Sequence, residues 1–337
     1  ILLTGTAGFI GSNFVPYFLE KYPNYNLVNL DLLTYAGNLD NLKECENNPR
    51  YKFIKGDICN RELVEFIFNE YDIQGVIHFA AESHVDNSIK NPGVFVQTNV
   101  NGTFTLIDVA YKYWMNKPFS YKEKYNNCRF HHISTDEVYG TLSLDPHDLF
   151  TEKTPYAPNS PYSASKASSD MIVRSYQETY GLNTVITNCS NNYGPKQHDE
   201  KLIPTIIRKA LNNEAIPIYG DGKNIRDWLY VLDHCKGIDL VYHTGKTANT
   251  YNIGGRNERT NLQIVDAICS ILDEKVPSKT LTSYKELITF VEDRAGHDRR
   301  YAIDATKLEN ELGWKANENF DSGIVLTVDW YLGKYNI

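Results

Sequence analysis

Short apolar runs alternate with longer amphipathic segments along the first half of the chain. The apolar runs cover residues 1–4, 27–31, 51–57, 75–81, 129–135 and 184–190. Between them, residues 9–22, 61–71 and 94–114 carry apolar positions at a period of about 3.6 residues, which predicts helices. Strands that alternate with helices form right-handed βαβ units, so we predict an α/β fold with a doubly wound parallel sheet.

The pattern changes after about Asn188 to loops and short helices, at residues 200–213, 234–244, 261–274 and 304–313. Residues 250–255 form one more candidate strand, which suggests that two lobes interleave along the chain. We therefore predict one domain from residues 1–187 and about 227–255. A smaller α/β domain takes residues 188–226 and about 256–337.

Composition and charge narrow the classes of function. The 337 residues carry a formal charge of −8, which argues against a nucleic-acid-binding surface because phosphates require clustered Lys and Arg. No apolar run approaches the roughly 20 residues of a membrane helix. The six cysteines lack C-x-x-C spacing, so we predict no metal site and no disulfide framework. No secretory signal pattern opens the chain, so we expect a soluble cytoplasmic protein whose initiator methionine precedes Ile1.

A glycine-rich segment, "TGTAGFIG" at residues 4–11, joins the first strand to the first helix. Glycines at such a turn let a pyrophosphate approach backbone N–H groups at the helix N-terminus, although a plain strand-to-helix turn is the alternative. Asp31 ends the second strand about 20 residues later, where a carboxylate binds ribose hydroxyls and favours NAD over NADP. We predict a Rossmann-type NAD site formed by Gly5, Gly8, Phe9, Ile10, Gly11, Asp31, Thr34, Asp57, Ile58, Ala80, Ala81, Tyr162 and Lys166.

The segment "YSASK" places Tyr162 and Lys166 four residues apart, on one face of a predicted helix at 161–180. A free tyrosine has a pKa near 10, which is too high for a base at neutral pH. A neighbouring ammonium and a cationic nicotinamide ring would lower that pKa. A surface pair is the common alternative for Y-x-x-x-K. Together with Thr135 at the end of a strand, the two residues predict a hydride-transfer centre.

These features resemble the extended short-chain dehydrogenase/reductase superfamily over essentially the whole chain. Asp136 and Glu137 follow Thr135 directly, and two carboxyl groups there have no task in simple oxidation and reduction. Elimination of water next to a ketone does need a base and an acid, and adjacent carboxyls help to keep one of them protonated.

Longer strings, including "ISTDEVYG", "SPYSASKASSD", "TNCSNNYGP" and "PIYGDGKNIRDWLYV", resemble the dTDP-glucose 4,6-dehydratase family. The resemblance implies a lyase in which Tyr162, Lys166 and Thr135 act at carbon 4 of the hexose. Glu137 would then take the proton from carbon 5, and Asp136 would protonate the hydroxyl that leaves carbon 6. NAD would be regenerated, and the product would be dTDP-4-keto-6-deoxyglucose, a precursor of deoxysugars such as rhamnose.

The resemblance also implies a nucleotide-sugar site and a partner subunit. Candidate residues for dTDP-glucose are Ser83, His84, Asn191, Lys201, Tyr219, Arg226, Asn261, Arg294 and His297. The helices at 94–114 and 161–180 carry apolar residues on more than one face, which fits a homodimer through a helix bundle. Three alternatives stay open: a 4,6-dehydratase of UDP-glucose or GDP-mannose, a non-catalytic nucleotide-sugar sensor, and, disfavoured by the acid pair, a 4-epimerase.

Overall fold

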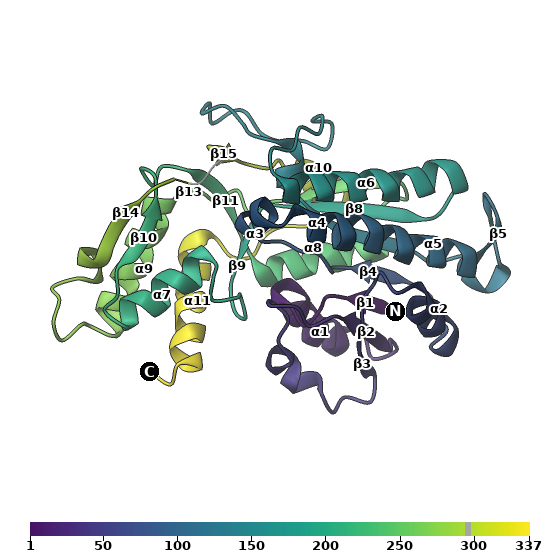
Figure 1. Cartoon of the computed structure of the whole chain (residues 1–337), viewed down its shortest axis with the longest axis horizontal. Coiled ribbons are helices and arrows are strands. Elements are labelled where there is room, and N and C mark those ends of the chain that lie inside the picture. The colour runs from purple at the N-terminus through teal and green to yellow at the C-terminus, as the bar shows by residue number, and fades with distance from the viewer. Residues whose placement is uncertain (294–297) are drawn as a thin grey trace.

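The computed structural model describes residues 1–293 and 298–337, which form a larger and a smaller lobe (Figure 1). The larger lobe contains a seven-stranded sheet in the order β12-β8-β7-β4-β1-β2-β3, and all of its strand pairs are parallel. The strands are β1 (Leu2–Thr4), β2 (Leu27–Asp31), β3 (Tyr51–Lys55), β4 (Val76–His78), β7 (Phe130–Thr135), β8 (Thr184–Cys189) and β12 (Asn249–Ile253). This sheet confirms the predicted Rossmann-type fold class.

Helices cover both faces of the sheet, and successive strand residues point to opposite faces. Leu3 packs in one core with α1 (Phe9–Lys21) and α8 (Val231–Thr244). Leu2 packs in the other core with α2 (Arg61–Glu70), α5 (Thr103–Trp114) and α6 (Pro161–Tyr180). Because both faces of the central strands are buried, these strands need no polar side, as the apolar sequence of β1 and the fully buried residues of β2 and β8 illustrate.

The prediction of one continuous α-helix over residues 94–114 is wrong. The structure has α4 (Pro92–Phe95), then a π-helical segment, η2 (Val96–Gly102), and then α5. The π-helical segment places Asn99 where its amide donates to the carbonyl oxygen of Glu82 at 3.0 Å and to Oγ of Ser165 at 2.8 Å. It therefore joins the loop after β4 to α6, and π-helical turns are common at such functional positions.

The smaller lobe contains α7 (Leu202–Leu211), α9 (Asn261–Lys275) and α11 (Phe320–Lys334), which pack against short strands. Its strands are β9 (Asn191–Tyr193), β10 (Ile216–Tyr219), β11 (Ile225–Tyr230), β13 (Glu258–Thr260), β14 (Ile288–Val291) and β15 (Arg300–Tyr301). The sequence predicted an α/β class for this lobe, but it located neither α11 nor the individual strands. β12 lies in the large sheet although it follows the first strands of the smaller lobe, and the exact domain boundaries stay a prediction.

Short elements complete the chain. They are α3 (Val85–Lys90), α10 (Thr306–Leu312), β5 (Met115–Lys117), β6 (Ser120–Tyr121), η1 (Leu39–Cys45), η3 (Glu123–Tyr125), η4 (Asp136–Tyr139) and η5 (Tyr284–Leu287). Within the described ranges, no helix has the length and apolar character that crossing a membrane would require.

Candidate active site

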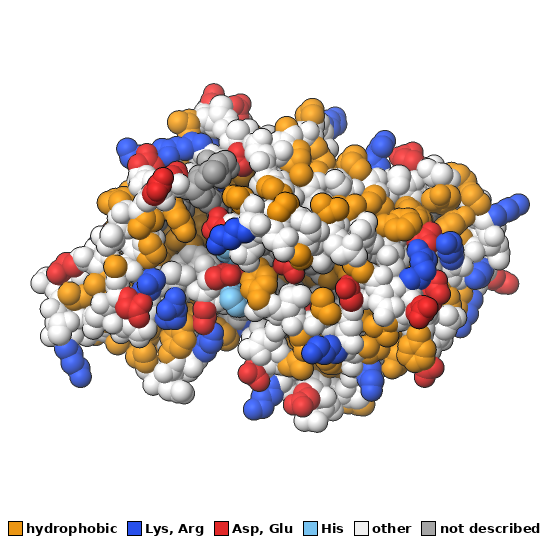
Figure 2. Space-filling view, viewed as in Figure 1, with side chains coloured by type: hydrophobic (Ala, Val, Ile, Leu, Met, Phe, Trp, Pro, Cys, Tyr) orange, Lys and Arg blue, Asp and Glu red, His pale blue; other side chains and the backbone are white. Residues whose placement is uncertain are grey.

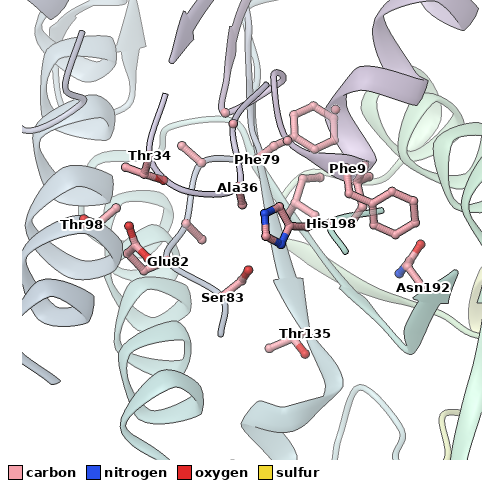
Figure 3. Close-up of a pocket in the computed structure, with 18 of the residues that line it drawn as sticks. Phe9, Thr34, Ala36, Phe79, Glu82, Ser83, Thr98, Thr135, Asn192 and His198 are labelled. Carbon is pink, nitrogen blue, oxygen red and sulfur yellow. The ribbon is translucent and has the colours of Figure 1, made fainter. Parts of the chain in front are cut away.

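A cavity lies at the carboxyl ends of the large sheet and extends to the smaller lobe. Strand order reverses between β1 and β4, and ligands of doubly wound sheets bind at such a point. The cavity has a volume of about 320 Å³. Thr34, Glu82, Ser83 and Thr135 from the large lobe line it together with Asn192 and His198 (Figure 3). Figure 2 shows that charged side chains of both signs gather at the surface between the lobes.

The glycine loop has the shape that a dinucleotide needs. Gly5 has φ +71°, and a Cβ there would lie 2.5 Å from Cα of Ala80, while a Cβ on Gly11 would lie 2.4 Å from Cα of Thr6. A Cβ on Gly8 would meet only the carbonyl oxygen of Gly5, at 3.3 Å, so that side of the loop faces open space. No side chain caps α1 within the described residues. Its first N–H groups can therefore bind a pyrophosphate.

Carboxylates end the next two strands beside this loop. Asp31 accepts backbone hydrogen bonds from Ala7 at 2.9 Å and from Leu33 at 2.8 Å, one on each oxygen. These contacts fix the orientation of its carboxylate and leave lone pairs for ribose hydroxyls. Asp57 accepts a hydrogen bond from the N–H of Cys59 at 2.8 Å. Every predicted NAD residue lines the cavity, so the residues present fit a dinucleotide.

Tyr162 and Lys166 lie in the first turns of α6, which enter the same cavity. Ser160 and Ser163 form a capping box, and Pro161 takes the first helical position, so local sequence fixes where the helix begins. Lys166 is 3% exposed, and its Nζ donates to the carbonyl oxygen of Ile133 at 2.8 Å.

The pKa of Tyr162 is shifted in the direction opposite to the one expected from the sequence. Burial raises this pKa well above its usual value, and the charge of Glu137 raises it further, while the hydroxyl of Thr135 lowers it. The sequence led us to expect that Lys166 lowers the pKa of Tyr162. In the protein without a ligand this pKa is raised instead, because burial has a larger effect on it than any neighbouring group. Tyr162 is a neutral phenol until additional positive charge enters the cavity.

Asp136 and Glu137 occupy the first turn after β7. The Thr135 hydroxyl donates to Oδ1 of Asp136 at 3.4 Å and accepts from the N–H of Glu137 at 3.3 Å. Burial raises the pKa of Asp136 well above its usual range, and the neighbouring charge of Glu137 adds to this effect. Among the described residues no donor reaches Oδ2 of Asp136. Both effects favour the protonated form of this buried carboxyl group, which is the form that can donate a proton in the cavity.

The structure places only some of the candidates for the nucleotide sugar in the cavity. Ser83, Asn191 and Lys201 line the cavity. His84 lies at its edge, with Nε2 3.7 Å from Oε2 of Glu200. Outside the lining lie Tyr219, which is 42% exposed on β10, and Asn261, the first residue of α9. Arg294 and His297 lie outside the described residues.

Arg226 is buried rather than open to the cavity. Its guanidinium donates to the carbonyl oxygen of Asp298 at 2.9 Å and lies 4.3 Å from the ring centroid of Tyr301. The phenol of Tyr301 in turn donates to Asp298, and the charge of Glu137 contributes to its raised pKa. Arg226 thus supports a tyrosine close to Glu137.

Several residues of the cavity were not predicted. Tyr35, Thr98, Cys189, Asn192, Gln197, His198 and Glu200 line it, and Tyr301 lies near Glu137. Glu200 directly precedes Lys201 in the string "EKLIP". Because Lys201 was predicted, the same string could have indicated Glu200. Tyr301 comes from the two-residue strand β15, and no local motif marks it.

Comparison with known proteins gives consistent results. A family model described as GDP-mannose 4,6 dehydratase matches residues 2–327. A dTDP-glucose 4,6-dehydratase from Salmonella typhimurium is 54% identical, over 98% of this chain and 92% of its own length. The crystal structure of a dTDP-glucose 4,6-dehydratase from Bacillus anthracis in complex with NAD is 46% identical, with a TM-score of 0.86 over 99% of this chain and 97% of that chain. The corresponding enzyme from Streptomyces venezuelae, with NAD bound, is 42% identical, with a TM-score of 0.88 and the same coverage of both chains.

Proposed function

The chain belongs to the dTDP-glucose 4,6-dehydratase family, and from this premise we propose that it converts dTDP-glucose to dTDP-4-keto-6-deoxyglucose with bound NAD. The observation that carries the proposal is the meeting of Tyr162, Asp136 and Glu137 in one cavity beside the glycine loop. An epimerase or a sensor has no use for a buried protonated acid next to a carboxylate at this position.

The glycine loop, Asp31 and Asp57 hold the dinucleotide at the carboxyl ends of β1, β2 and β3. Bound NAD would supply a hydride acceptor for carbon 4 of the hexose and a hydride donor for carbon 6, so the overall reaction would involve no net oxidation. Its positive nicotinamide ring would also lower the pKa of Tyr162, which burial raises.

The side chains of this protein move the protons. Tyr162 takes the proton of the 4-hydroxyl group, while the Thr135 hydroxyl hydrogen-bonds the same oxygen. The 4-ketone makes the proton on carbon 5 acidic, and Glu137 removes it. Asp136 gives its proton to the hydroxyl group that leaves carbon 6 as water, and Glu137 returns its proton to carbon 5 when hydride reaches carbon 6. Burial of Asp136 supports this assignment, because it raises the pKa of the carboxyl group and so favours the protonated form that an acid needs.

The substrate's diphosphate and sugar extend from the cavity toward the smaller lobe. Asn191 and Lys201 offer donors there, with Ser83, His84 and Glu200 around the hexose. Arg226 acts at the sugar site through Tyr301, whose ring it covers. Asn261 and Tyr219 remain candidates for the diphosphate and the base. We further propose that the enzyme acts in the cytoplasm as a homodimer.

A panel of dTDP-, UDP- and GDP-hexoses tests this proposal. The protein loaded with NAD should turn over dTDP-glucose fastest and give a 4-keto-6-deoxy sugar, which absorbs in alkali. Faster turnover of UDP-glucose or GDP-mannose would reassign the substrate. Formation of dTDP-galactose would make the chain an epimerase, and binding without turnover would make it a sensor.

A further inference from the structure

Three ionisable residues follow one face of α6 at four-residue intervals: Tyr162, Lys166 and Asp170. This spacing stacks them along the helix. Tyr162 reaches the active-site cavity, whereas Asp170 lies about 12 Å further along the helix axis and has no exposed surface. The reaction proposed above uses Tyr162 and Lys166, and it leaves this buried carboxyl without a role.

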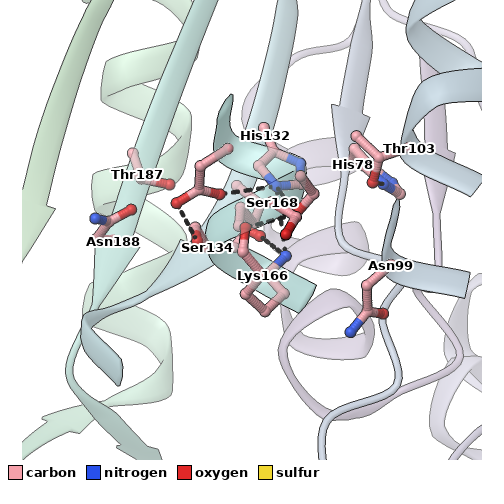
Figure 4. A network of polar contacts seen from close by, with 12 residues as sticks. His78, Asn99, Thr103, His132, Ser134, Lys166, Ser168, Thr187 and Asn188 are labelled. Atoms are coloured by element: carbon pink, nitrogen blue, oxygen red, sulfur yellow. Dashed lines mark hydrogen bonds and ion pairs between the residues drawn. The ribbon is translucent and has the colours of Figure 1, made fainter. Parts of the chain in front are cut away.

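His132 of β7 lies between the two charged residues of this stripe. Its Nε2 is 3.5 Å from Nζ of Lys166 and 3.2 Å from Oδ1 of Asp170. All three side chains are almost completely buried. Figure 4 shows His132, Lys166 and Ser134 grouped together between β7 and α6.

The carboxyl group of Asp170 is held in a fixed orientation. Its Oδ2 accepts hydrogen bonds from Oγ of Ser134 at 2.8 Å and from the phenol of Tyr156 at 2.9 Å. No hydrogen-bond donor reaches Oδ1 in the part of the chain that the structure describes, and this buried oxygen is directed toward His132. Burying a carboxylate oxygen without a hydrogen-bond donor costs free energy of folding, and a nearby positive charge can offset this cost.

The charges of Lys166 and Asp170 compensate each other. Burial lowers the pKa of Lys166, and the largest opposing influence is the charge of Asp170. Burial raises the pKa of Asp170 to about 6, and the largest opposing influence there is Lys166. Burial, followed by the charge of Lys166, lowers the pKa of His132 well below its usual value, so the imidazole between them is neutral.

We propose that Asp170 is a positioning residue for the reaction, whose carboxylate keeps Lys166 protonated across His132 and so maintains the cation on which Tyr162 depends. This inference rests on the proposed function for its catalytic part only. The pairing of Lys166 with Asp170 exists whether or not the protein turns over a sugar.

The groups that face Asp170 determine whether its charge favours or disfavours the phenolate form of Tyr162. They are Lys166 on the same helix, His132 on β7, Tyr156 in the loop before α6, and Tyr139 in η4, whose pKa the charge of Asp170 helps to raise. Tyr162 instead faces Glu137, Cys189 and Asp136. Loss of the Asp170 charge therefore acts on Tyr162 mainly through Lys166, and it should disfavour the phenolate.

A double-mutant cycle on the full chain without substrate tests the pairing. Lys166→Met, Asp170→Asn and the double variant are compared with wild type by thermal unfolding at pH 8. Lys166→Met leaves a buried carboxylate without its counter-charge, so we expect a large drop in Tm. Adding Asp170→Asn should recover at least half of that drop. Additive losses in the double variant would overturn the proposal.

The catalytic consequence is measured as a pH profile of kcat with NAD and dTDP-glucose. Asp170→Asn should lower kcat at pH 7 by about 10- to 100-fold, leave KM nearly unchanged and move the acid limb up by about one pH unit. Tyr156→Phe is the matched control, because it removes one hydrogen bond to Asp170 and keeps the charge. It should leave the limb in place.

Equal losses in Asp170→Asn and Tyr156→Phe, with no movement of the limb, would show a merely structural role and overturn the proposal. A wild-type protein that does not turn over dTDP-glucose would instead contradict the proposed function. The thermal cycle would still decide whether Asp170 supports Lys166.

Discussion

Tyr162 is held as a neutral phenol by the protein itself, since burial and the charge of Glu137 both raise its pKa. In the proposed mechanism, the positive charges of Lys166 and of bound NAD make this phenol reactive. Removing the phenol in Tyr162→Phe should lower kcat by about 10²- to 10⁴-fold, the range for loss of a general base. The measurement is steady-state turnover of dTDP-glucose, with Tm as a control for folding. Turnover close to that of wild type would remove Tyr162 from the mechanism.

Glu137 is assigned to carbon 5, so its loss should block the reaction after the first oxidation. Glu137→Gln should still transfer hydride, seen as absorbance of reduced nicotinamide, and should form product at least about 100-fold more slowly. Rapid-mixing absorbance and product analysis separate the two steps. Undiminished product formation would show that another group takes the proton from carbon 5.

The buried carboxyl of Asp170 also predicts a pH dependence of stability. Its pKa is about 6 in the folded protein and about 3.8 when unfolded, so the folded state binds the proton more tightly. The stability that comes from the protonated form is complete below about pH 3.8 and is lost as the pH rises through about 6. The difference in unfolding free energy between Asp170→Asn and wild type should therefore change across this window, by up to about 3 kcal/mol. Denaturant titrations between pH 4 and 8 measure it, and a constant difference would contradict the assignment.

At this scale the sequence predicted residues that belong to motifs and missed residues that only the fold brings together. Tyr162, Lys166, Thr135, Asp136 and Glu137 lie in two short segments, and they meet in one cavity as expected. Tyr301, on a strand of the smaller lobe, lies near Glu137, and no sequence pattern marks it. The pKa of Tyr162 could not be predicted with the right sign, because it depends on burial.

Among the elements, the glycine loop depends most clearly on the absence of a side chain. A methyl group on Gly8 would face the open side of the loop, 3.3 Å from the carbonyl oxygen of Gly5, where a pyrophosphate must approach. Gly8→Ala should therefore weaken NAD binding by about tenfold or more, equivalent to about 1.4 kcal/mol, with little change in Tm. Fluorescence titration with NAD measures this effect. Gly333→Ala is a control, because a Cβ on Gly333 meets no atom within 4 Å; equal affinities in both variants would place the dinucleotide elsewhere.

The elements of the large lobe were predictable because most of its strands are buried on both faces and its long helices carry apolar positions at a helical period. Every predicted strand of that sheet is present, including β12 far along the chain. The strands of the smaller lobe are short and partly exposed, as β14 illustrates, so their sequences lack a clear period. The π-helical segment η2 was also hidden, since its composition fits an ordinary helix.

At the scale of the whole molecule, α3 to α6 present an apolar surface. Its exposed members are Ile89, Val94, Val96, Phe104 and Met171. We predict that a second copy of the chain covers this surface, so that Phe104→Glu should shift the protein from dimer to monomer in sedimentation experiments. Phe66 on α2 is more exposed, at 55% against 44% for Phe104, and Phe66→Glu should leave the dimer intact. A monomeric wild type, or dimers in both variants, would contradict this interface.

The central claim is that one cavity oxidises carbon 4, eliminates water across carbons 5 and 6, and reduces carbon 6. The most direct test uses dTDP-glucose that carries deuterium on carbon 4, with mass spectrometry and NMR of the product. The account predicts a 4-keto-6-deoxy sugar that has lost one water and carries the deuterium in its new methyl group. Deuterium retained on carbon 4, or a product that still contains the 6-hydroxyl group, would contradict it.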